Sequence, residues 1–402
     1  MLKGKRILIG ISGGIAAYKI PELIRSLVKA GAEVRVATTP NALQFVTELT
    51  LQTVSGSRVY SDVFAAINEH STEHISLPDW CDAMIVAPAT ANVIGKMAAG
   101  IADDALTTTI CSCTARKPIL VAPAMNDKMW ESPATQQAVA TIRGWENVRV
   151  IEPAEGPLAC GTSGKGRMPE IEEIQEAIEY MLAPQDLSGK KILITAGGTQ
   201  EKIDPVRFIS NYSTGKMGIA LAHECARRGA HVTLVCGHID ATLYNPFGAI
   251  TRIDTLSAEE MYQACMAEWR HMDGAILCAA VADFTPAHPA NEKIKKQPGE
   301  TEMNLTLRTT TDIAKALGMS KREDQMLIGF ALETEHEKEN ALRKMERKRM
   351  DGIVLNSLRD AGAGFGTDTN KVTIIRSDKK EAELPLLSKT AVAAHIINSF
   401  FI

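Results

Sequence analysis

The chain has 402 residues, enough for two or three domains of ordinary size. Its 45% hydrophobic and 23% charged residues are typical of a globular protein with real cores, and a formal net charge of −4 argues against a general binder of nucleic acid or anionic membranes. No apolar run approaches the ~20 residues that a membrane span needs. Eight cysteines without a C-x-x-C pattern, and no secretory leader pattern, favour a reducing compartment, so we expect a cytoplasmic protein.

The two halves of the chain begin with similar segments. Residues 2–14 (LKGKRILIGISGG) and 187–199 (LSGKKILITAGGT) each consist of a basic lead-in, an apolar run of strand length and a glycine-rich turn. The polar, proline-containing stretch 183–186 between the two halves is typical of a linker. We therefore expect two domains, residues 1–186 and 187–402.

Short apolar strands alternate with helical patterns through both halves. The expected strands of the first half are Arg6–Ile11, Glu33–Thr38, Ala83–Ala87, Ile119–Ala122 and Val148–Ile151. A helix is expected over Ile15–Ala30, where apolar residues recur at steps of three and four. The expected strands of the second half are Lys191–Ala196, His231–Cys236, Gly274–Ala279, Met326–Phe330, Ile353–Asn356 and Val372–Ile375.

These strands are continuous rather than alternating apolar runs, which indicates strands covered on both faces and therefore parallel sheets. The predicted fold class is α/β, with two Rossmann-like domains that each contain a mostly parallel sheet flanked by helices. Open sheets of this kind bind ligands beyond the carboxyl ends of their strands. Residues at strand ends are thus the first candidates for function.

Glycine-rich turns follow the first strand of each half, at residues 10–14 and 196–199. Such turns let backbone N–H groups approach a phosphate at a helix N-terminus. Neither turn is a G-x-G-x-x-G, and the second strands end in Ala37-Thr38-Thr39 and Val235-Cys236-Gly237, without the acid that holds an adenosine ribose. NAD is therefore disfavoured, while a mononucleotide site and a simple tight turn both remain open.

Asn126 lies in the segment Pro123–Trp130, directly after an expected strand. Its amide could orient a carboxylate within an apolar wall, or it could cap the helix that follows; local physics does not separate the two. His70 and His74 lack a third ligand at metal-binding spacing, so we favour a surface pair over zinc and keep a role for His74 in proton transfer or orientation. Cys160 lies in a flap with three glycines and two cations, surroundings that favour a reactive thiol.

Four segments of the first half, residues 12–18, 87–92, 123–130 and 159–162, resemble the homo-oligomeric flavin-containing cysteine decarboxylases across residues 1–180. The resemblance implies a catalytic Cys160 as proton donor, an active-site His74, and Asn126 and Met129 at the substrate, with Asn126 on its carboxylate. It also implies an FMN site formed by Ser12, Gly13, Gly14, Thr38, Thr90 and Asn92. Thr162 stands where this family usually has aspartate, which concerns a detail of the flap.

The chemistry explains the need for a flavin. A cysteine residue held in an amide has no electron sink for the carbanion that loss of CO₂ leaves, and oxidation of its thiol to a thioaldehyde creates one. Cys160 would then protonate the ene-thiol product. The cycle is redox-neutral overall.

The second half contains a long polar segment, residues 197–218, between a strand and a helix, and long loops in that position are usually functional. Asp283 closes another strand, where it could hold Mg²⁺ or a nucleotide hydroxyl. The cationic runs 293–296 and 343–349 are either solvated faces or the partners of a triphosphate. The glycine-rich residues 361–366 could be a mobile loop or a connector.

Residues 187–402 resemble phosphopantothenate–cysteine ligases, through the segments 204–211, 213–218, 279–284, 293–296 and 329–334. The resemblance implies that Asn211 holds an acyl-cytidylate, that Lys293 promotes cysteine attack, and that Arg207 and Asn211 contact the substrate. The implied CTP-binding residues are Asp283, Lys293, Thr310, Thr311, Asp312, Ile313, Phe330, Lys344 and Lys348, with Mg²⁺ at Asp283.

Both halves in this order resemble the bacterial bifunctional proteins of coenzyme A biosynthesis. The resemblance implies 4′-phosphopantothenate, cysteine and CTP as substrates, and a homo-oligomer with trimer-based flavin domains and dimeric ligase domains. Two rivals are a flavin-binding regulatory protein without catalysis and a tandem nicotinamide oxidoreductase. Release of CO₂ in a single turnover would exclude the first rival, and bound flavin without NAD would exclude the second.

Overall fold

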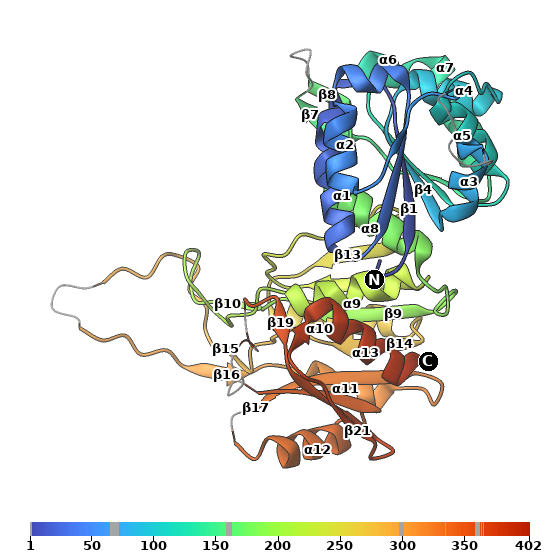
Figure 1. Cartoon of the computed structure of the whole chain (residues 1–402). Coiled ribbons are helices and arrows are strands. Elements are labelled where there is room, and N and C mark those ends of the chain that lie inside the picture. The colour runs from blue at the N-terminus through green and yellow to red at the C-terminus, as the bar shows by residue number, and fades with distance from the viewer. Residues whose placement is uncertain are drawn as a thin grey trace. The chain divides into compact units, whose positions relative to one another are not determined.

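The computed structural model describes residues 2–64, 72–157, 163–296, 301–333, 335–357, 362, 364 and 366–402. The chain divides into two compact units, Met1–Ala183 and Pro184–Ile402 (Figure 1). Each unit is described below by itself.

A parallel sheet forms the centre of the first unit. In spatial order its described strands are β3 (Val59–Tyr60), β2 (Glu33–Thr38), β1 (Arg6–Ile11), β4 (Ala83–Ala89), β5 (Ile119–Pro123) and β6 (Val148–Val150). Strand β1 therefore lies between β2 and β4, where the direction of winding reverses. This is the doubly wound strand order, whose reversal point opens a crevice at the carboxyl ends of the strands.

The described helices of this unit are η1 (Ile15–Lys19), α1 (Ile20–Lys29), η2 (Pro40–Gln44), α2 (Glu48–Ser55), α3 (Glu73–Trp80), α4 (Ala91–Ala99), α5 (Ala105–Thr114), α6 (Asp127–Glu131), α7 (Pro133–Arg143) and α8 (Ile171–Leu182). The expected helix Ile15–Ala30 is in fact a 3-10 turn followed by α1. Pro21 explains the break, because proline fits the first turn of a helix but not its interior.

Alternate residues of the strands pack against helices on opposite faces of the first sheet. Leu8, Met84 and Val121 belong to a core with side chains of α3, α4, α5 and α7, and α8 contacts β4 and β5. Both faces are covered (Figure 1), which is why the strands are apolar throughout.

The second unit repeats this plan with two added strands. In spatial order its main sheet consists of β13 (Ile250–Asp254), β12 (His231–Cys236), β9 (Lys191–Ala196), β14 (Gly274–Leu277), β17 (Met326–Glu333), β18 (Gly352–Ser357), β20 (Val372–Arg376) and β21 (Glu381–Glu383). The strands from β13 to β18 are parallel, and β20 and β21 are antiparallel. The reversal of winding again falls beside the first strand, here between β9 and β14.

Each face of this sheet packs in its own hydrophobic core. Helices α9 (Lys216–Arg227) and α13 (Lys389–Phe401) pack on the face that includes Ile276 and Val354. Helices α10 (Ala258–Trp269), α11 (Ile313–Ser320) and α12 (Glu337–Arg347) pack on the opposite face. The predicted fold class, two Rossmann-like α/β domains with mostly parallel sheets flanked by helices, is confirmed (Figure 1).

Small antiparallel pairs extend from the sheets: β7 (Ala154–Pro157) with β8 (Ser163–Arg167), β10 (Gln200–Lys202) with β11 (Phe208–Ser210), β15 (Phe284–Pro286) with β16 (Leu307–Thr309), and β19 (Thr369–Asn370) with β22 (Leu387–Ser388). Some strand predictions need correction. The strand expected to reach Ala279 ends at Leu277, and the strand expected to end at Phe330 continues to Glu333. Strand β13 was not expected, because three of its five side chains are exposed.

Within the described residues, no helix has the length and hydropathy of a membrane span. The same residues contain no group of three or more His, Cys, Asp and Glu side chains arranged to hold a metal ion.

Candidate active sites

A cavity of about 1150 Å³ opens in the first unit. Its lining includes the turns after β1, β2 and β4 and the start of α6, which is the crevice that the strand order predicts. Ile15, Tyr18 and Met129 line it and are 57%, 61% and 49% exposed, so one wall is both apolar and open. Apolar walls with a few polar groups are the usual surroundings of a planar cofactor.

Four of the six residues expected at the flavin, Gly13, Gly14, Thr90 and Asn92, line this cavity. Gly13 has no room for a side chain, because a Cβ there would lie 2.5 Å from the Cβ of Asn41. The turn after β1 can therefore pack against the turn after β2 only while this residue is glycine.

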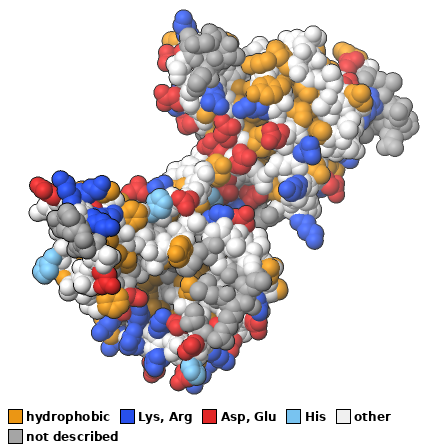
Figure 2. Space-filling view, turned by 90° about the vertical axis from the view of Figure 1, so that its left-hand side faces the viewer, with side chains coloured by type: hydrophobic (Ala, Val, Ile, Leu, Met, Phe, Trp, Pro, Cys, Tyr) orange, Lys and Arg blue, Asp and Glu red, His pale blue; other side chains and the backbone are white. Residues whose placement is uncertain are grey.

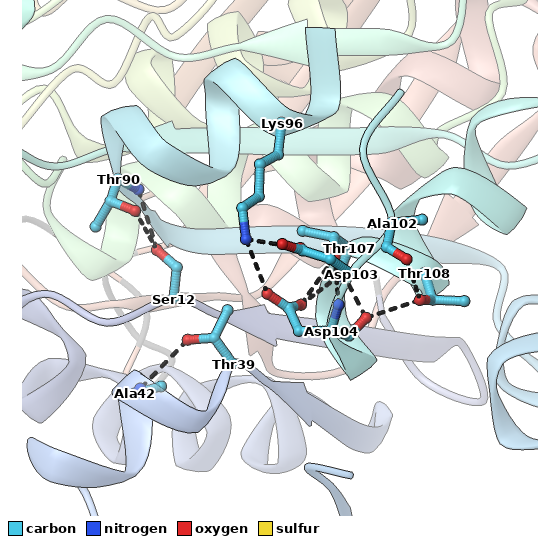
Figure 3. Close-up of polar contacts among 10 residues, drawn as sticks. All are labelled: Ser12, Thr39, Ala42, Thr90, Lys96, Ala102, Asp103, Asp104, Thr107 and Thr108. Atoms are coloured by element: carbon cyan, nitrogen blue, oxygen red, sulfur yellow. Dashed lines mark hydrogen bonds and ion pairs between the residues drawn. The ribbon is translucent and has the colours of Figure 1, made fainter. Parts of the chain in front are cut away.

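The other two, Ser12 and Thr38, are fully buried and do not line the cavity. The hydroxyl of Ser12 donates to the carbonyl of Pro88 at 2.7 Å. It also lies 3.1 Å from Oγ1 of Thr90 and accepts the N–H of Thr90 at 3.0 Å (Figure 3). Ser12 thus joins the turn after β1 to the start of α4. Oγ1 of Thr38 is buried without a hydrogen-bond partner.

A charged network lies at the edge of the same cavity. Nζ of Lys96 on α4 is 2.7 Å from Oδ1 of Asp103 and 3.5 Å from Oδ2 of Asp104, and Asp104 caps α5 by accepting the N–H of Thr107 (Figure 3). The hydrogen bond to Asp103 raises the pKa of Lys96 above its usual value, so the ammonium stays charged. We did not predict these residues from the sequence. The pattern that could have identified them is an Asp-Asp pair before a helical segment, which is typical of a helix N-terminus.

Asn126 caps a helix and also lies at the cavity. Its side chain caps α6 by accepting the N–H of Lys128 at 3.0 Å, and the residue also lines the cavity, as Met129 does. His74 lies on α3 and is not among the lining residues. Cys160, Thr162 and His70 fall outside the described residues.

These features fit an FMN. The start of α4 at Thr90 has no side-chain cap, so its N–H groups and partial positive charge face the region where a phosphate would bind. The unpartnered hydroxyl of Thr38 and the turn at Gly13 lie at the carboxyl ends of the neighbouring strands β2 and β1, which pair at Thr38 and Ile11. The exposed apolar wall would take an aromatic ring system.

The second unit has a cavity of about 840 Å³ at the carboxyl ends of β9, β14, β17 and β18. Nine residues expected at its ligands line this cavity: Asn211, Asp283, Thr310, Thr311, Asp312, Ile313, Phe330, Lys344 and Lys348. They come from five separate stretches of the chain, so the fold brings together what the sequence spreads over 138 positions (211 to 348).

Hydrogen bonds connect this part of the cavity. The N–H of Thr310 donates to the carbonyl of Asp283 at 3.0 Å, and Nζ of Lys348 lies 2.9 Å from Oδ1 of Asp312, which caps α11. Burial alone would raise the pKa of Asp312, but the N–H of Lys315 and the ammonium of Lys348 hold it below its usual value. Nζ of Lys344 lies 2.5 Å from Glu333. Two ammonium groups thus line the same cavity as the exposed carboxylate of Asp283.

Lys293 and Arg207 are not among the lining residues. Lys293 is exposed on the segment between β15 and β16. Arg207 binds the buried carboxylate of Asp204, with Nε 2.9 Å from Oδ2, and donates to the carbonyl of Ile294 at 2.7 Å. Asn211, by contrast, is oriented toward the cavity by the donation of its amide to the carbonyl of Ala280 at 2.8 Å.

Further polar residues that were not predicted also line the second cavity, among them Lys216, Arg347, Asn356, Asn370 and Lys389. Lys216 begins α9 and Lys389 begins α13, so both helices direct their N-termini at the cavity. Among these residues, Lys216 could have been identified from the sequence, because it ends a Ser-Thr-Gly-Lys segment.

Two doubly wound units define a two-site α/β enzyme of nucleotide-dependent chemistry. The cavity of one has a glycine turn and an open apolar wall that fit a flavin, and the cavity of the other is lined by lysines and an exposed aspartate. Comparisons with known proteins agree with this class. The model of the family described as Flavoprotein matches residues 1–183, and that of the DNA/pantothenate metabolism flavoprotein C-terminal domain matches residues 187–401.

The Bacillus subtilis (strain 168) protein named Coenzyme A biosynthesis bifunctional protein CoaBC is 46% identical over 400 residues, which cover 99% of this chain and 97% of that protein. Two solved structures are also similar. One is the C-terminal domain of a Coenzyme A biosynthesis bifunctional protein CoaBC, with 39% identity, a TM-score of 0.45, and coverage of 54% of this chain and 95% of that chain. The other is the FMN binding protein AtHal3, with 33% identity, a TM-score of 0.41, and coverage of 45% and 97%.

The chain belongs to the bifunctional CoaBC family of coenzyme A biosynthesis. It combines a flavin-dependent phosphopantothenoylcysteine decarboxylase with a phosphopantothenate–cysteine ligase in one polypeptide, and it contains an FMN-binding flavoprotein domain. These assignments agree with the resemblances noted from the sequence.

Proposed function

We propose that residues 187–402 ligate cysteine to 4′-phosphopantothenate at the cost of CTP, and that residues 1–186 then decarboxylate the product to 4′-phosphopantetheine. The observation that carries the ligase assignment is the single cavity lined by Asp283, Thr310–Ile313, Lys344 and Lys348. Fixed positive charge is what a triphosphate and a departing pyrophosphate require.

In the first half-reaction, the carboxylate of 4′-phosphopantothenate attacks the α-phosphate of CTP and pyrophosphate leaves. Asp283 would carry Mg²⁺, which usually takes one or two carboxylates plus substrate phosphates. Lys344 and Lys348 would neutralise the phosphates, and the amide of Asn211 would hold the acyl-cytidylate. The exposed position of Asp283 and the orientation of Asn211 support these roles.

In the second half-reaction, the amine of cysteine attacks the acyl carbon. The bond from that carbon to the cytidylate oxygen breaks, CMP leaves, and the nitrogen loses a proton. Lys293 would promote this step from its exposed segment, and Arg207 would contact the substrate from the turn to which that segment is bound.

For decarboxylation, FMN would be held by the turn at Ser12–Gly14, by Thr38, and by Thr90 and Asn92 at the start of α4. When bound, FMN supplies a two-electron acceptor for the substrate thiol. Asn126 would hold the substrate carboxylate through its amide, and Met129 would provide apolar contact. The position of both side chains in the cavity supports these roles.

Cys160 would protonate the product carbon, and His74 would orient or transfer a proton. Exposed hydrophobic side chains are visible on the unit in the upper part of Figure 2, and three such residues, Ile15, Tyr18 and Met129, line the cavity. A second copy that covers the part of this wall that flavin and substrate leave exposed would bury it, which supports a homo-oligomer. We propose an assembly that is trimer-based in the flavin unit and dimeric in the ligase unit, as the family resemblance implies.

The experiment for the ligase is a burst assay. Full-length protein is mixed with 4′-phosphopantothenate, CTP and Mg²⁺ without cysteine. We expect one equivalent of pyrophosphate per site, and CMP only after cysteine is added. Pyrophosphate that appears only with cysteine would contradict a separate acyl-cytidylate step.

A further inference from the structure

Three cationic side chains line the first cavity among its described residues: Lys19, Lys96 and Arg167. None of them belongs to the residues proposed above for FMN or for the substrate carboxylate. The substrate of the flavin unit carries a 4′-phosphate as well as a carboxylate, and a phosphate is bound best by charged donors. The charges around each cation indicate where this group can bind.

The wall around Lys96 is negative overall. Nζ of Lys96 lies 2.7 Å from Oδ1 of Asp103 and 3.5 Å from Oδ2 of Asp104, and both aspartates line the cavity. One ammonium group beside two carboxylates leaves this part of the wall with a net negative charge, which repels a phosphate. The 4′-phosphate therefore needs a different part of the cavity.

The end of the cavity at Lys19 and Arg167 is positive overall. Nη2 of Arg167 lies 3.1 Å from Oε1 of Glu170, and Nζ of Lys19 lies 3.7 Å from Oε2 of the same carboxylate. Two cations thus share one acid, whose side chain is 52% exposed. Exposed ion pairs contribute little to stability, so Arg167 can exchange Glu170 for a ligand while Lys19 still pairs with it.

The guanidinium of Arg167 is held by the β7–β8 hairpin. Arg167 ends β8, and a Cβ at Gly156 of β7 would lie 2.9 Å from Nη1, so the side chain packs where β7 has glycine. Gly166 faces the other way, because a Cβ there would lie 2.3 Å from the carbonyl oxygen of Met125, beside Asn126. Alternation along β8 thus directs the guanidinium away from the turn proposed for the carboxylate. A substrate with a carboxylate at one end and a phosphate at the other requires such a separation.

We propose that Arg167 binds the 4′-phosphate of the decarboxylase substrate, with Lys19 adding positive charge, and that this contact selects phosphorylated over unphosphorylated cysteinyl substrates. The inference rests on the proposed decarboxylase function. Arginine suits the role because its planar guanidinium presents a rigid fork of N–H donors that matches phosphate oxygens. The phosphate of FMN is a separate group, since the uncapped start of α4 at Thr90 faces its expected position.

The test measures CO₂ release by the full-length holoenzyme from two substrates, 4′-phosphopantothenoylcysteine and pantothenoylcysteine, which lacks the phosphate. Wild type should prefer the phosphorylated substrate in kcat/KM. We expect Arg167→Met to reduce that preference about tenfold, through a higher KM for the phosphorylated substrate. Flavin content and kcat/KM for pantothenoylcysteine should stay within twofold of wild type. Arg167→Lys, which keeps the charge without the fork, should lose part of the preference.

Lys165→Met is the matched control, because Lys165 lies on the same strand, pairs with Glu152 at 2.6 Å and is not among the lining residues. This variant should keep the wild-type preference. Glu170→Gln should keep or strengthen the preference, since it frees Arg167. A loss in Glu170→Gln as large as that in Arg167→Met would show that the ion pair is structural, and would overturn the subsite.

Three other results would overturn the subsite alone. They are a wild type without preference for the phosphorylated substrate, an equal loss on both substrates in Arg167→Met, and loss of flavin from that variant, which would assign the arginine to FMN. If Arg167→Met does not fold, Arg167→Lys decides, and a preference equal to wild type would reject the subsite. Wild type that holds FMN but releases no CO₂ from 4′-phosphopantothenoylcysteine would overturn the decarboxylase proposal and the subsite with it.

Discussion

Arg207 is bound to the carboxylate of Asp204, with Nε 2.9 Å and Nη2 2.5 Å from Oδ2. The same guanidinium donates to the carbonyl of Ile294, and the N–H of Ile294 returns a hydrogen bond to Asp204 at 3.2 Å. The turn after β10 is thereby bound to the segment that carries Lys293. Arg207, which we expect to contact the substrate, therefore also helps to position the segment of Lys293, the proposed catalytic lysine.

Replacing Asp204 should release that segment. We expect Asp204→Asn to lower ligation about tenfold, because Lys293 loses its anchor, and to leave decarboxylation of 4′-phosphopantothenoylcysteine unchanged. Separate assays of pyrophosphate and CO₂ check this. An equal loss of both activities would show that Asp204 supports the whole chain rather than the ligase unit.

The same carboxylate predicts a pH dependence of stability. Hydrogen bonds from Arg207 hold the pKa of Asp204 well below its usual value. The unfolded chain therefore binds this proton more readily, so the stabilisation is fully present above the unfolded pKa of about 3.9 and is lost as pH falls through the folded pKa. Urea unfolding should show a gap between wild type and Asp204→Asn at pH 7 that narrows below about pH 4. A gap that widens on acidification would contradict this account.

Lys348 should matter for CTP. Its ammonium lies 2.9 Å from Asp312 and lines the cavity, so Lys348→Gln should raise the KM for CTP about tenfold or more through the loss of a charged contact to phosphate. Lys338→Gln is a matched control, because Lys338 lies on α12, the helix that Lys348 follows, and pairs with Glu381 instead. Equal effects of the two substitutions would remove Lys348 from the nucleotide site.

Gly13 should control flavin binding. In Gly13→Ala the new Cβ would meet Asn41 at 2.5 Å and displace the turn, so we expect protein purified without most of its flavin absorbance but with full ligase activity. Gly95→Ala on α4 is the control, since a Cβ there meets nothing within 4 Å. That control should keep its flavin and gain about 0.5–1 kcal/mol in the free energy of unfolding.

Cys160→Ala should separate oxidation from protonation. We expect this variant to keep FMN and to consume 4′-phosphopantothenoylcysteine once, and then to stall before the saturated product is released. Rapid-quench analysis of a single turnover would detect the unsaturated product. Normal turnover would remove Cys160 from the mechanism.

Much of the fold could be predicted because the central strands are buried on both faces and are therefore continuous apolar runs. Strands such as β1, β9 and β12 have the predicted limits. The edge strand β13 has exposed side chains at Thr251 and Arg252, so it shows no apolar run. Local sequence could not identify it because its pairing with β12 is a tertiary contact.

The sites were predicted unevenly for a similar reason. Gly13 and Asp283 follow strands in a recognisable pattern. Asn356 is a single polar residue near the end of an apolar strand, and only the folded structure shows that it lines the cavity. Lys389 is 388 positions from the start of the chain and reaches the cavity because α13 packs beside α9. No spacing rule connects such residues.

The central claim is that ligation precedes decarboxylation and that each takes place in its own unit. The most direct measurement follows CO₂ from two mixtures with the same full-length protein, one with synthetic 4′-phosphopantothenoylcysteine and one with 4′-phosphopantothenate and cysteine. We predict that the first mixture releases CO₂ without CTP, and that the second releases it only with CTP and Mg²⁺, after pyrophosphate. Release from the second mixture without CTP, or a requirement for CTP in the first, would contradict the account.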